Sequence, residues 1–322
     1  MVRAAAGLLL ALTLSPPPAW SQAAIEKSPP ETTAPEIAGV VKGGTRVQLI
    51  RDLFMATEGP IAMPDGSLLF TEQDAGDGRL VKIDKDDNIT TYLDNTNRTI
   101  GLAYDPKGRL LAAQSRIPRI GVLAPTRATL AEEYGGQPLI FPNDLVADKK
   151  GGIYFTDQVS TRFRPAPAGR KPLVFYIQPG GTLVVATEDV TRPNGVMLSP
   201  DETILYATNG PVITAFDVQP DGSLRNGRTW AELAGLPRNA AGEPQGGADG
   251  VAVDSAGRFY AATGVGVQVF SPEGKHLGTI PIPLPPQAIA FAGTDKKTLY
   301  VVGRGAVYKI AMVAQGFLGR AK

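Results

Sequence analysis

The sequence predicts an all-β fold, a β-propeller of six blades, from three observations. From Thr45 onward, short runs of β-branched and aromatic residues alternate with Asp-Gly, Pro-Asp and Lys-Gly turns, as in strands joined by tight turns. No long stretch shows the apolar period of a helix. One unit recurs six times at spacings of about 38 to 55 residues, close to the roughly 40 to 50 residues of a four-stranded blade.

Each copy of this unit holds a polar or apolar first residue, a small or acidic residue, a short apolar strand, a polar turn and a second apolar strand. The copies begin at Glu58, Ile100, Asn143, Asn194, Asp249 and Gln287. The residues that follow each copy supply outer strands, for example Leu80–Ile83 and Thr90–Leu93. Val47–Ile50 precedes the first copy and is expected to pair with the last blade, which closes the ring and removes an exposed edge.

Two segments precede the expected propeller, which covers residues 45–322. Residues 1–23 have Arg3 near the start, an apolar stretch over Ala4–Leu14 and small residues near 19–23, the pattern of a signal peptide. The apolar stretch is too short to span a bilayer. Residues 24–44 are rich in Pro, Thr, Glu and Ala and are expected to form a flexible leader. We therefore expect a periplasmic or secreted protein with no membrane segment in its mature form.

Composition limits the chemistry that the chain can perform. Its 32 basic and 31 acidic residues give no charged footprint for nucleic acid. The absence of cysteine excludes disulfides, thiolate nucleophiles and thiolate metal sites, and a single histidine, His276, excludes paired-histidine zinc sites. Oxygen ligands and carboxylates are expected to carry the function, with a small molecule as the partner and a monomer as the assembly.

The first residue of each copy lies on the innermost strand of a blade, so these six side chains are expected around the central channel. Five of the six carry an oxygen, and Glu58 and Asp249 are carboxylates. Calcium takes about six to eight oxygen ligands from carboxylates, amides and water. The pattern predicts one divalent cation at the axis, with Ca²⁺ expected and Zn²⁺, Mg²⁺ or Mn²⁺ as alternatives. Taken singly, Pro-Asn-Asp, Pro-Asn-Gly and Ala-Asp-Gly are also ordinary turn sequences.

Several segments resemble the senescence marker protein (regucalcin)/gluconolactonase family. The resemblance extends from about Thr45 to Ile310. It rests on Glu58-Gly59-Pro60, Tyr134-Gly135-Gly136, Pro142-Asn143-Asp144-Leu145, Tyr154-Phe155-Thr156-Asp157, Pro193-Asn194-Gly195-Val196 and Ala248-Asp249-Gly250.

This resemblance implies a six-bladed propeller with metal ligands at Glu58, Asn194 and Asp249. It also implies that Asn143 binds the metal or the substrate and that Asp249 is the general base. Some members of the family have an arginine two positions before the residue matching Asn143, where it holds sugar hydroxyls. Here that position is Phe141, which makes Phe141 a candidate substrate contact and indicates a less polar substrate.

The residues and the resemblance together predict a metal-dependent hydrolase that opens a lactone, as a gluconolactonase does, or a related carboxylic ester at the central channel. Two alternatives stay open. One is a non-catalytic periplasmic ligand-binding propeller, because the fold hosts many functions. The other is an organophosphate-type hydrolase of the same family.

Other polar residues are interpreted as structural or stay open. Asp84, Asp86 and Asn88 imitate the start of a calcium-binding loop, but Ile89 replaces its required glycine, so a solvated turn is expected. His276 is expected in an outer hairpin. Arginines near predicted strand ends could hold an anionic group at the channel mouth or lie on a solvated surface. They are Arg116, Arg119, Arg192 and Arg304.

Overall fold

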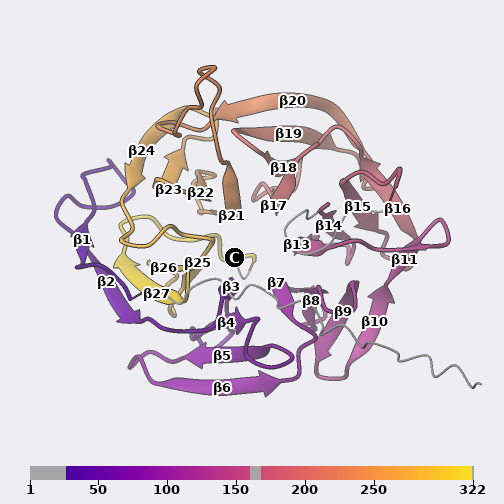
Figure 1. The fold of residues 1–322 in the computed structure, drawn as a ribbon, viewed down its shortest axis with the longest axis horizontal. Helices are drawn as coiled ribbons and strands as arrows, with labels where there is room; N and C mark the ends of the chain where they lie inside the picture. The colour runs from indigo at the N-terminus through magenta and orange to yellow at the C-terminus, as the bar shows by residue number, and fades with distance from the viewer. Residues whose placement is uncertain (1–26, 160–167, 321–322) are drawn as a thin grey trace, which may run out of the picture.

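Six antiparallel sheets stand around a central axis, each with its strands ordered from the axis outward (Figure 1). The structure, a computed structural model, describes residues 27–159 and 168–320. In these two ranges the regular elements are strands, and no helix there is long and apolar enough to cross a membrane. The predicted six-bladed β-propeller is confirmed.

The first three blades follow the order in which the sequence repeats. Blade 1 is β3 (Thr57–Ala62), β4 (Leu68–Glu72), β5 (Arg79–Ile83) and β6 (Ile89–Asp94). Blade 2 is β7 (Thr99–Tyr104), β8 (Leu110–Gln114), β9 (Arg119–Ala124) and β10 (Ala128–Ala131). A short hairpin of β11 (Glu133–Tyr134) and β12 (Gln137–Pro138) precedes blade 3, which is β13 (Pro142–Ala147), β14 (Ile153–Asp157), β15 (Leu173–Ile177) and β16 (Leu183–Thr187).

The last three blades complete the ring. Blade 4 is β17 (Pro193–Leu198), β18 (Ile204–Asn209), β19 (Val212–Val218) and β20 (Leu224–Glu232). Blade 5 is β21 (Ala248–Val253), β22 (Phe259–Thr263), β23 (Gly266–Phe270) and β24 (His276–Ile280). Blade 6 takes β25 (Ala288–Ala292), β26 (Thr298–Gly303) and β27 (Ala306–Ala311) from the end of the chain and β2 (Arg46–Arg51) and β1 (Thr32–Thr33) from its start.

The N-terminal strand closes the ring, as the sequence predicts. β2 pairs antiparallel with β27, with Leu49 opposite Tyr308, and β1 pairs with the outer edge of β2. Indigo and yellow strands therefore lie in one sheet (Figure 1). Because the first and last parts of the chain share this sheet, the ring is held by backbone hydrogen bonds as well as by packing between blades.

The expected flexible leader over residues 24–44 needs correction. Within residues 32–44, Ala34, Ile37, Val40 and Val41 are buried, in a core cluster that includes Tyr308. The Val40 carbonyl also accepts backbone hydrogen bonds from residues 313 and 314. A few irregularly spaced apolar residues suffice to cover the seam between blades 5 and 6, which composition alone did not indicate. Residues 24–26 and the expected signal peptide lie outside the described residues.

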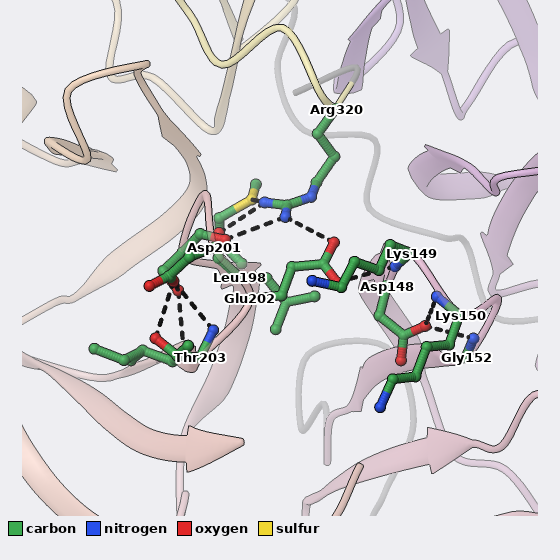
Figure 2. A network of polar contacts seen from close by, with 12 residues as sticks. Asp148, Lys149, Lys150, Gly152, Leu198, Asp201, Glu202, Thr203 and Arg320 are labelled. Atoms are coloured by element: carbon green, nitrogen blue, oxygen red, sulfur yellow. Dashed lines mark hydrogen bonds and ion pairs between the residues drawn. The ribbon is translucent and has the colours of Figure 1, made fainter. Parts of the chain in front are cut away.

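The segment after β27 packs where the inner strands finish, because Leu318–Arg320 line one pocket with Ala62, at the end of β3, and Ala147, at the end of β13. The Phe317 amide donates to the Val253 carbonyl of blade 5. The Arg320 guanidinium donates to the carbonyl oxygens of Leu198 (2.7 Å) and Ser199 (3.2 Å) and to the Glu202 carboxylate (Figure 2). This segment therefore links the last sheet to blades 5 and 4.

Candidate axial site

The inner strands are irregular at the residues predicted to face the axis. In β3 the pairing register shifts between Glu58 and Ile61, and β7, β13, β17 and β21 shift at the equivalent place. Such a bulge takes a residue out of the ladder and re-aims its side chain. In blade 6, β25 pairs with β26 without a shift. The bulges thus free Ile100, Asn143, Asn194 and Asp249 from regular pairing, whereas Glu58 stays opposite Thr71 and the register shifts just after it.

These residues surround a narrow cavity at the axis. Its polar lining is Glu58, Asn143, Asp144 and Asp249, and its apolar lining includes Ile100. The cavity volume is about 10 Å³, close to the space that one water-sized sphere needs. Glu58, Asn143 and Asp249, from three blades, therefore line one cavity, and Asn194 is not among the residues that line it.

Glycine after the axial residue lets the inner strands approach closely. A Cβ atom at Gly59 would lie 2.1 Å from the carbonyl oxygen of Ile100, and one at Gly195 would lie 2.3 Å from that of Asp249. These distances are far below van der Waals contact. The Pro-Asn-Gly and Ala-Asp-Gly sequences, which could have been turns, lie in β17 and β21, where glycine serves this close packing.

Asn194 lies beside Asp249. Its side chain hydrogen-bonds to the Asp249 carboxylate. Its Oδ1 atom is buried and has no hydrogen-bond partner among the described residues. A buried carbonyl oxygen without a donor is costly, so this atom is suited to a positively charged ligand.

Glu58 is oriented by blade 6. Gln287 Nε2 donates to Glu58 Oε1 at 2.8 Å, and Gln287 Oε1 accepts the backbone amide of Arg304 at 2.8 Å. The sequence predicts Gln287 at the axial position, and the structure shows it as a hydrogen-bond partner of the Glu58 carboxylate. Glu58 is 7% exposed.

The site makes ionised carboxylates costly. Burial, followed by the charges of Asp249 and Asp144, raises the pKa of Glu58 well above its usual range. Burial and then the Asp144 charge raise the pKa of Asp249 to about 7, against the lowering effects of the Asn194 hydrogen bond and the Arg304 charge. A divalent cation between these groups would offset the repulsion.

The donor set fits a hard cation only if amides take part. Among residues 27–159 and 168–320, no group of three or more His, Cys, Asp or Glu side chains is arranged to hold a metal. Glu58 and Asp249 supply two carboxylates, while Asn143 lines the cavity and Asn194 presents its unpartnered Oδ1. Carboxylate and amide oxygens are ligands that calcium accepts. The residues present therefore fit such an ion, and the ligand roles stay predictions.

Asp144 is a cavity residue to which the sequence led us to assign no role. It is 5% exposed and lines the cavity beside Asn143. One signal could have identified it. The residue after the axial position is glycine in blades 1, 2, 4 and 5, and aspartate in blade 3.

Phe141 lies in the loop that leads into β13 and does not line the narrow cavity itself. The loop is held by a buried carboxylate: Asp157 accepts the backbone amides of Ile140 (3.0 Å) and Phe141 (2.6 Å). Burial raises the pKa of Asp157 to about 6. Phe141, two residues before Asn143, is thus placed at the end of the channel where the inner strands begin.

The four candidate rim arginines differ in their surroundings. Arg304 is exposed, and its charge acts on Asp249. Arg116 forms an ion pair with Asp77. Arg119 Nε donates to Gln114 Oε1 at 2.6 Å, and Arg192 donates to the Gly246 carbonyl at 3.3 Å. Arg304 is the member of this set with an electrostatic effect on an axial carboxylate.

His276 and the turn at Asp84, which the sequence analysis interprets as structural, lie away from the axis. His276 is in β24, the outermost strand of blade 5, where Nε2 contacts Thr279 Oγ1 at 3.1 Å and the ring packs edge-on against Phe270. Asp84 accepts the backbone amides of Asp86 and Asn88 at 2.9 Å in the turn between β5 and β6. The contacts of His276 and of Asp84 are therefore local contacts within their own blades.

The sequence is similar to one protein family and to lactone-hydrolysing enzymes within it. A family model described as SMP-30/Gluconolactonase/LRE-like region matches residues 56–304. The chain is 27% identical to a gluconolactonase of Zymomonas mobilis over 281 residues, which is 77% of this chain and 75% of that protein. It is 34% identical to a lactonase of Staphylococcus haemolyticus over 145 residues, 44% of this chain and 42% of that protein.

Solved structures show the same fold. A gluconolactonase of Xanthomonas campestris superposes with a TM-score of 0.74 at 27% identity and covers 89% of this chain and 99% of that one. A calcium-binding protein of Agrobacterium tumefaciens, regucalcin, superposes with a TM-score of 0.68 at 16% identity, covering 84% and 95%. Since the family model matches well over half of the residues, this chain belongs to the SMP-30/gluconolactonase/LRE-like family.

Proposed function

We propose that this chain is a hydrolase that opens a lactone, or a related carboxylic ester, at the axial cavity. The observation that carries the proposal is the convergence of Glu58, Asn143 and Asp249 on one cavity, with Asn194 bonded to Asp249. Relatives named gluconolactonase and lactonase support a lactone substrate. Phe141 at the channel end favours a lactone with an apolar substituent over a sugar lactone.

We propose further that the reaction depends on one divalent cation, with calcium expected and Zn²⁺, Mg²⁺ or Mn²⁺ as alternatives. Glu58, Asn194 and Asp249 would hold it, with Asn143 as a further ligand or a substrate contact. When bound, such an ion polarises the substrate carbonyl and makes a water more acidic. The unpartnered Oδ1 of Asn194 and the mutual repulsion of the two carboxylates support this assignment.

Asp249 is the proposed general base. It takes a proton from a water molecule while the water oxygen adds to the carbonyl carbon. The ring C–O bond then breaks, and Asp249 returns the proton to the departing alkoxide, which leaves a hydroxy acid. In the site that holds a cation, Asp249 is kept ionised, which is the form that a general base needs. Gln287 holds Glu58 in place throughout, because it donates to Glu58 and is itself fixed by the Arg304 amide.

The test is hydrolysis of a lactone panel by chelator-treated protein after single cations are added back. We expect calcium to restore turnover, and Asp249→Asn to lower kcat by about 10² or more. Glu273→Gln, on an exposed turn of blade 5, is the matched control and should keep full activity. Full activity in chelator or in Asp249→Asn would refute the proposal, and ligand binding without turnover would favour a binding propeller.

We also propose that the protein is exported and acts as a monomer. The apolar N-terminal stretch supports export. The intact mass of protein recovered outside the cytoplasm should lack about 23 residues, and light scattering should give the mass of one chain. A full-length mass or a stable dimer would contradict it.

A further inference from the structure

Asp144 stands where the repeat otherwise has no side chain. Blades 1, 2, 4 and 5 have glycine at this position, immediately after the axial residue. In blade 3 the equivalent residue is a carboxylate that is 5% exposed and lines the axial cavity. A buried carboxylate is costly unless it is well bonded, so its contacts indicate what it does.

The Asp144 carboxylate bridges blades 3 and 4. Oδ1 accepts the amide of Leu145 at 2.9 Å, within its own strand, and Oδ2 accepts the amide of Val196 at 3.0 Å, in β17. Val196 is two residues after Asn194. The bond across the seam therefore holds the inner strand of blade 4 next to one of the proposed cation ligands.

A second contact holds the same strand at Asn194 itself. The Asp144 amide donates to Thr156 Oγ1 at 3.1 Å, and Thr156 Oγ1 donates to the Asn194 carbonyl at 2.7 Å. Asp144 and Thr156 together fix the Asn194 carbonyl and the Val196 amide. The stretch of backbone that carries the Asn194 side chain is therefore held in place beside Asp249.

We propose that Asp144 is a positioning residue that fixes Asn194 across the seam between blades 3 and 4 and adds negative charge beside the cation site, without contacting cation or substrate itself. This inference rests on the proposed function. The Asp144 charge already acts on both neighbouring carboxylates, Glu58 and Asp249. The same negative charge would attract a cation held between those two carboxylates and so stabilise its binding.

The experiment measures calcium affinity by titration calorimetry on the chelator-treated mature chain. We expect Asp144→Asn to weaken calcium binding by about 10- to 100-fold, the usual effect of removing an outer-shell partner. Thr156→Val keeps the charge but loses the bond to Asn194, and we expect a smaller loss. The control is Thr208→Val, at the same place in blade 4, whose hydroxyl has no partner among the described residues.

Hydrogen exchange of the Val196 amide in calcium-free protein is the second readout. It should speed up in Asp144→Asn and stay slow in Thr208→Val, while thermal melting shows that each variant is folded. Wild-type calcium affinity together with unchanged Val196 protection in Asp144→Asn would overturn the inference. If the wild-type chain itself binds no divalent cation, the metal part of the proposed function fails and this inference fails with it. If the wild type binds calcium and Asp144→Asn matches it in both calcium affinity and Val196 protection, this inference alone fails.

Discussion

At the scale of single residues, the axis brings together buried carboxylates that repel one another unless a positive charge lies between them. Glu58 and Asp249 both have raised pKa values because of burial and of neighbouring carboxylates. Asn194 adds an oxygen without a donor. Such an arrangement is unfavourable for stability alone, and perturbed carboxylates of this kind cluster at functional sites. We expect residues beside the axis to decide which substrate is accepted.

Phe141 should govern substrate polarity. We expect Phe141→Arg to raise kcat/KM for a hydroxylated sugar lactone about 10-fold relative to an alkyl lactone, because a guanidinium offers several donors to hydroxyl groups. Phe141→Leu keeps an apolar side chain and should not gain sugar lactone activity. Competition between the two substrates measures the ratio directly. An unchanged ratio in Phe141→Arg would remove Phe141 from the site.

Asp157 should give stability a specific pH dependence. Its pKa is about 6 in the folded protein and about 3.9 when exposed. Between these values the folded state holds a proton that the unfolded state has released, so this residue's contribution to the free energy of unfolding falls as pH rises from about 4 to 6. Asp157→Asn should remove that part of the pH dependence. Denaturant titrations at pH 4.5 and 7 test this, and identical pH profiles for both proteins would contradict it.

At the scale of elements, the strands were predictable and the bulges were not. Turn residues and short apolar runs located each inner pair of strands, because each run must bury its side chains between neighbouring blades. The bulge after Glu58 depends on the close approach of the next blade, where a Cβ at Gly59 would meet the Ile100 carbonyl. That neighbour is distant in sequence. The burial of Val40 and Val41 was missed for the same reason, since their partners lie in blades 5 and 6.

Gly195 tests the spacing between inner strands. We expect Gly195→Ala to lower the free energy of unfolding by about 1 to 3 kcal/mol, as overpacking does, and to disturb the site, because the new Cβ would sit 2.3 Å from the Asp249 carbonyl oxygen. Gly180→Ala, at a position with nothing within 4 Å, is the control. Chemical denaturation compares the two, and equal stability would mean that the strands can separate at no cost.

At the scale of the whole molecule, both ends of the described chain hold the ring. β2 completes the last sheet, and the C-terminal segment reaches blade 4 through Arg320. That Glu58, Asn143 and Asp249 line one axial cavity could be predicted from the register that they share across three blades. The contact of Asp144 could not, because its partner amide at Val196 is supplied by the neighbouring blade.

Arg320 should matter for stability rather than for catalysis. Its side chain is 8% exposed and donates to two carbonyl oxygens and to Glu202. We expect Arg320→Ala to cost about 2 to 4 kcal/mol, because it leaves buried acceptors without a charged donor. Lys275→Ala, on an exposed turn, should have no effect. A wild-type melting midpoint in Arg320→Ala would show that the C-terminal segment does not support the ring.

The most direct measurement is a crystal structure of the protein grown with calcium, with the ion identified by its anomalous scattering. We predict a single ion in the axial cavity, with oxygens of Glu58, Asn194 and Asp249 at about 2.3 to 2.6 Å from it. An axis without an ion at saturating calcium, or an ion held elsewhere while these three side chains point apart, would contradict it.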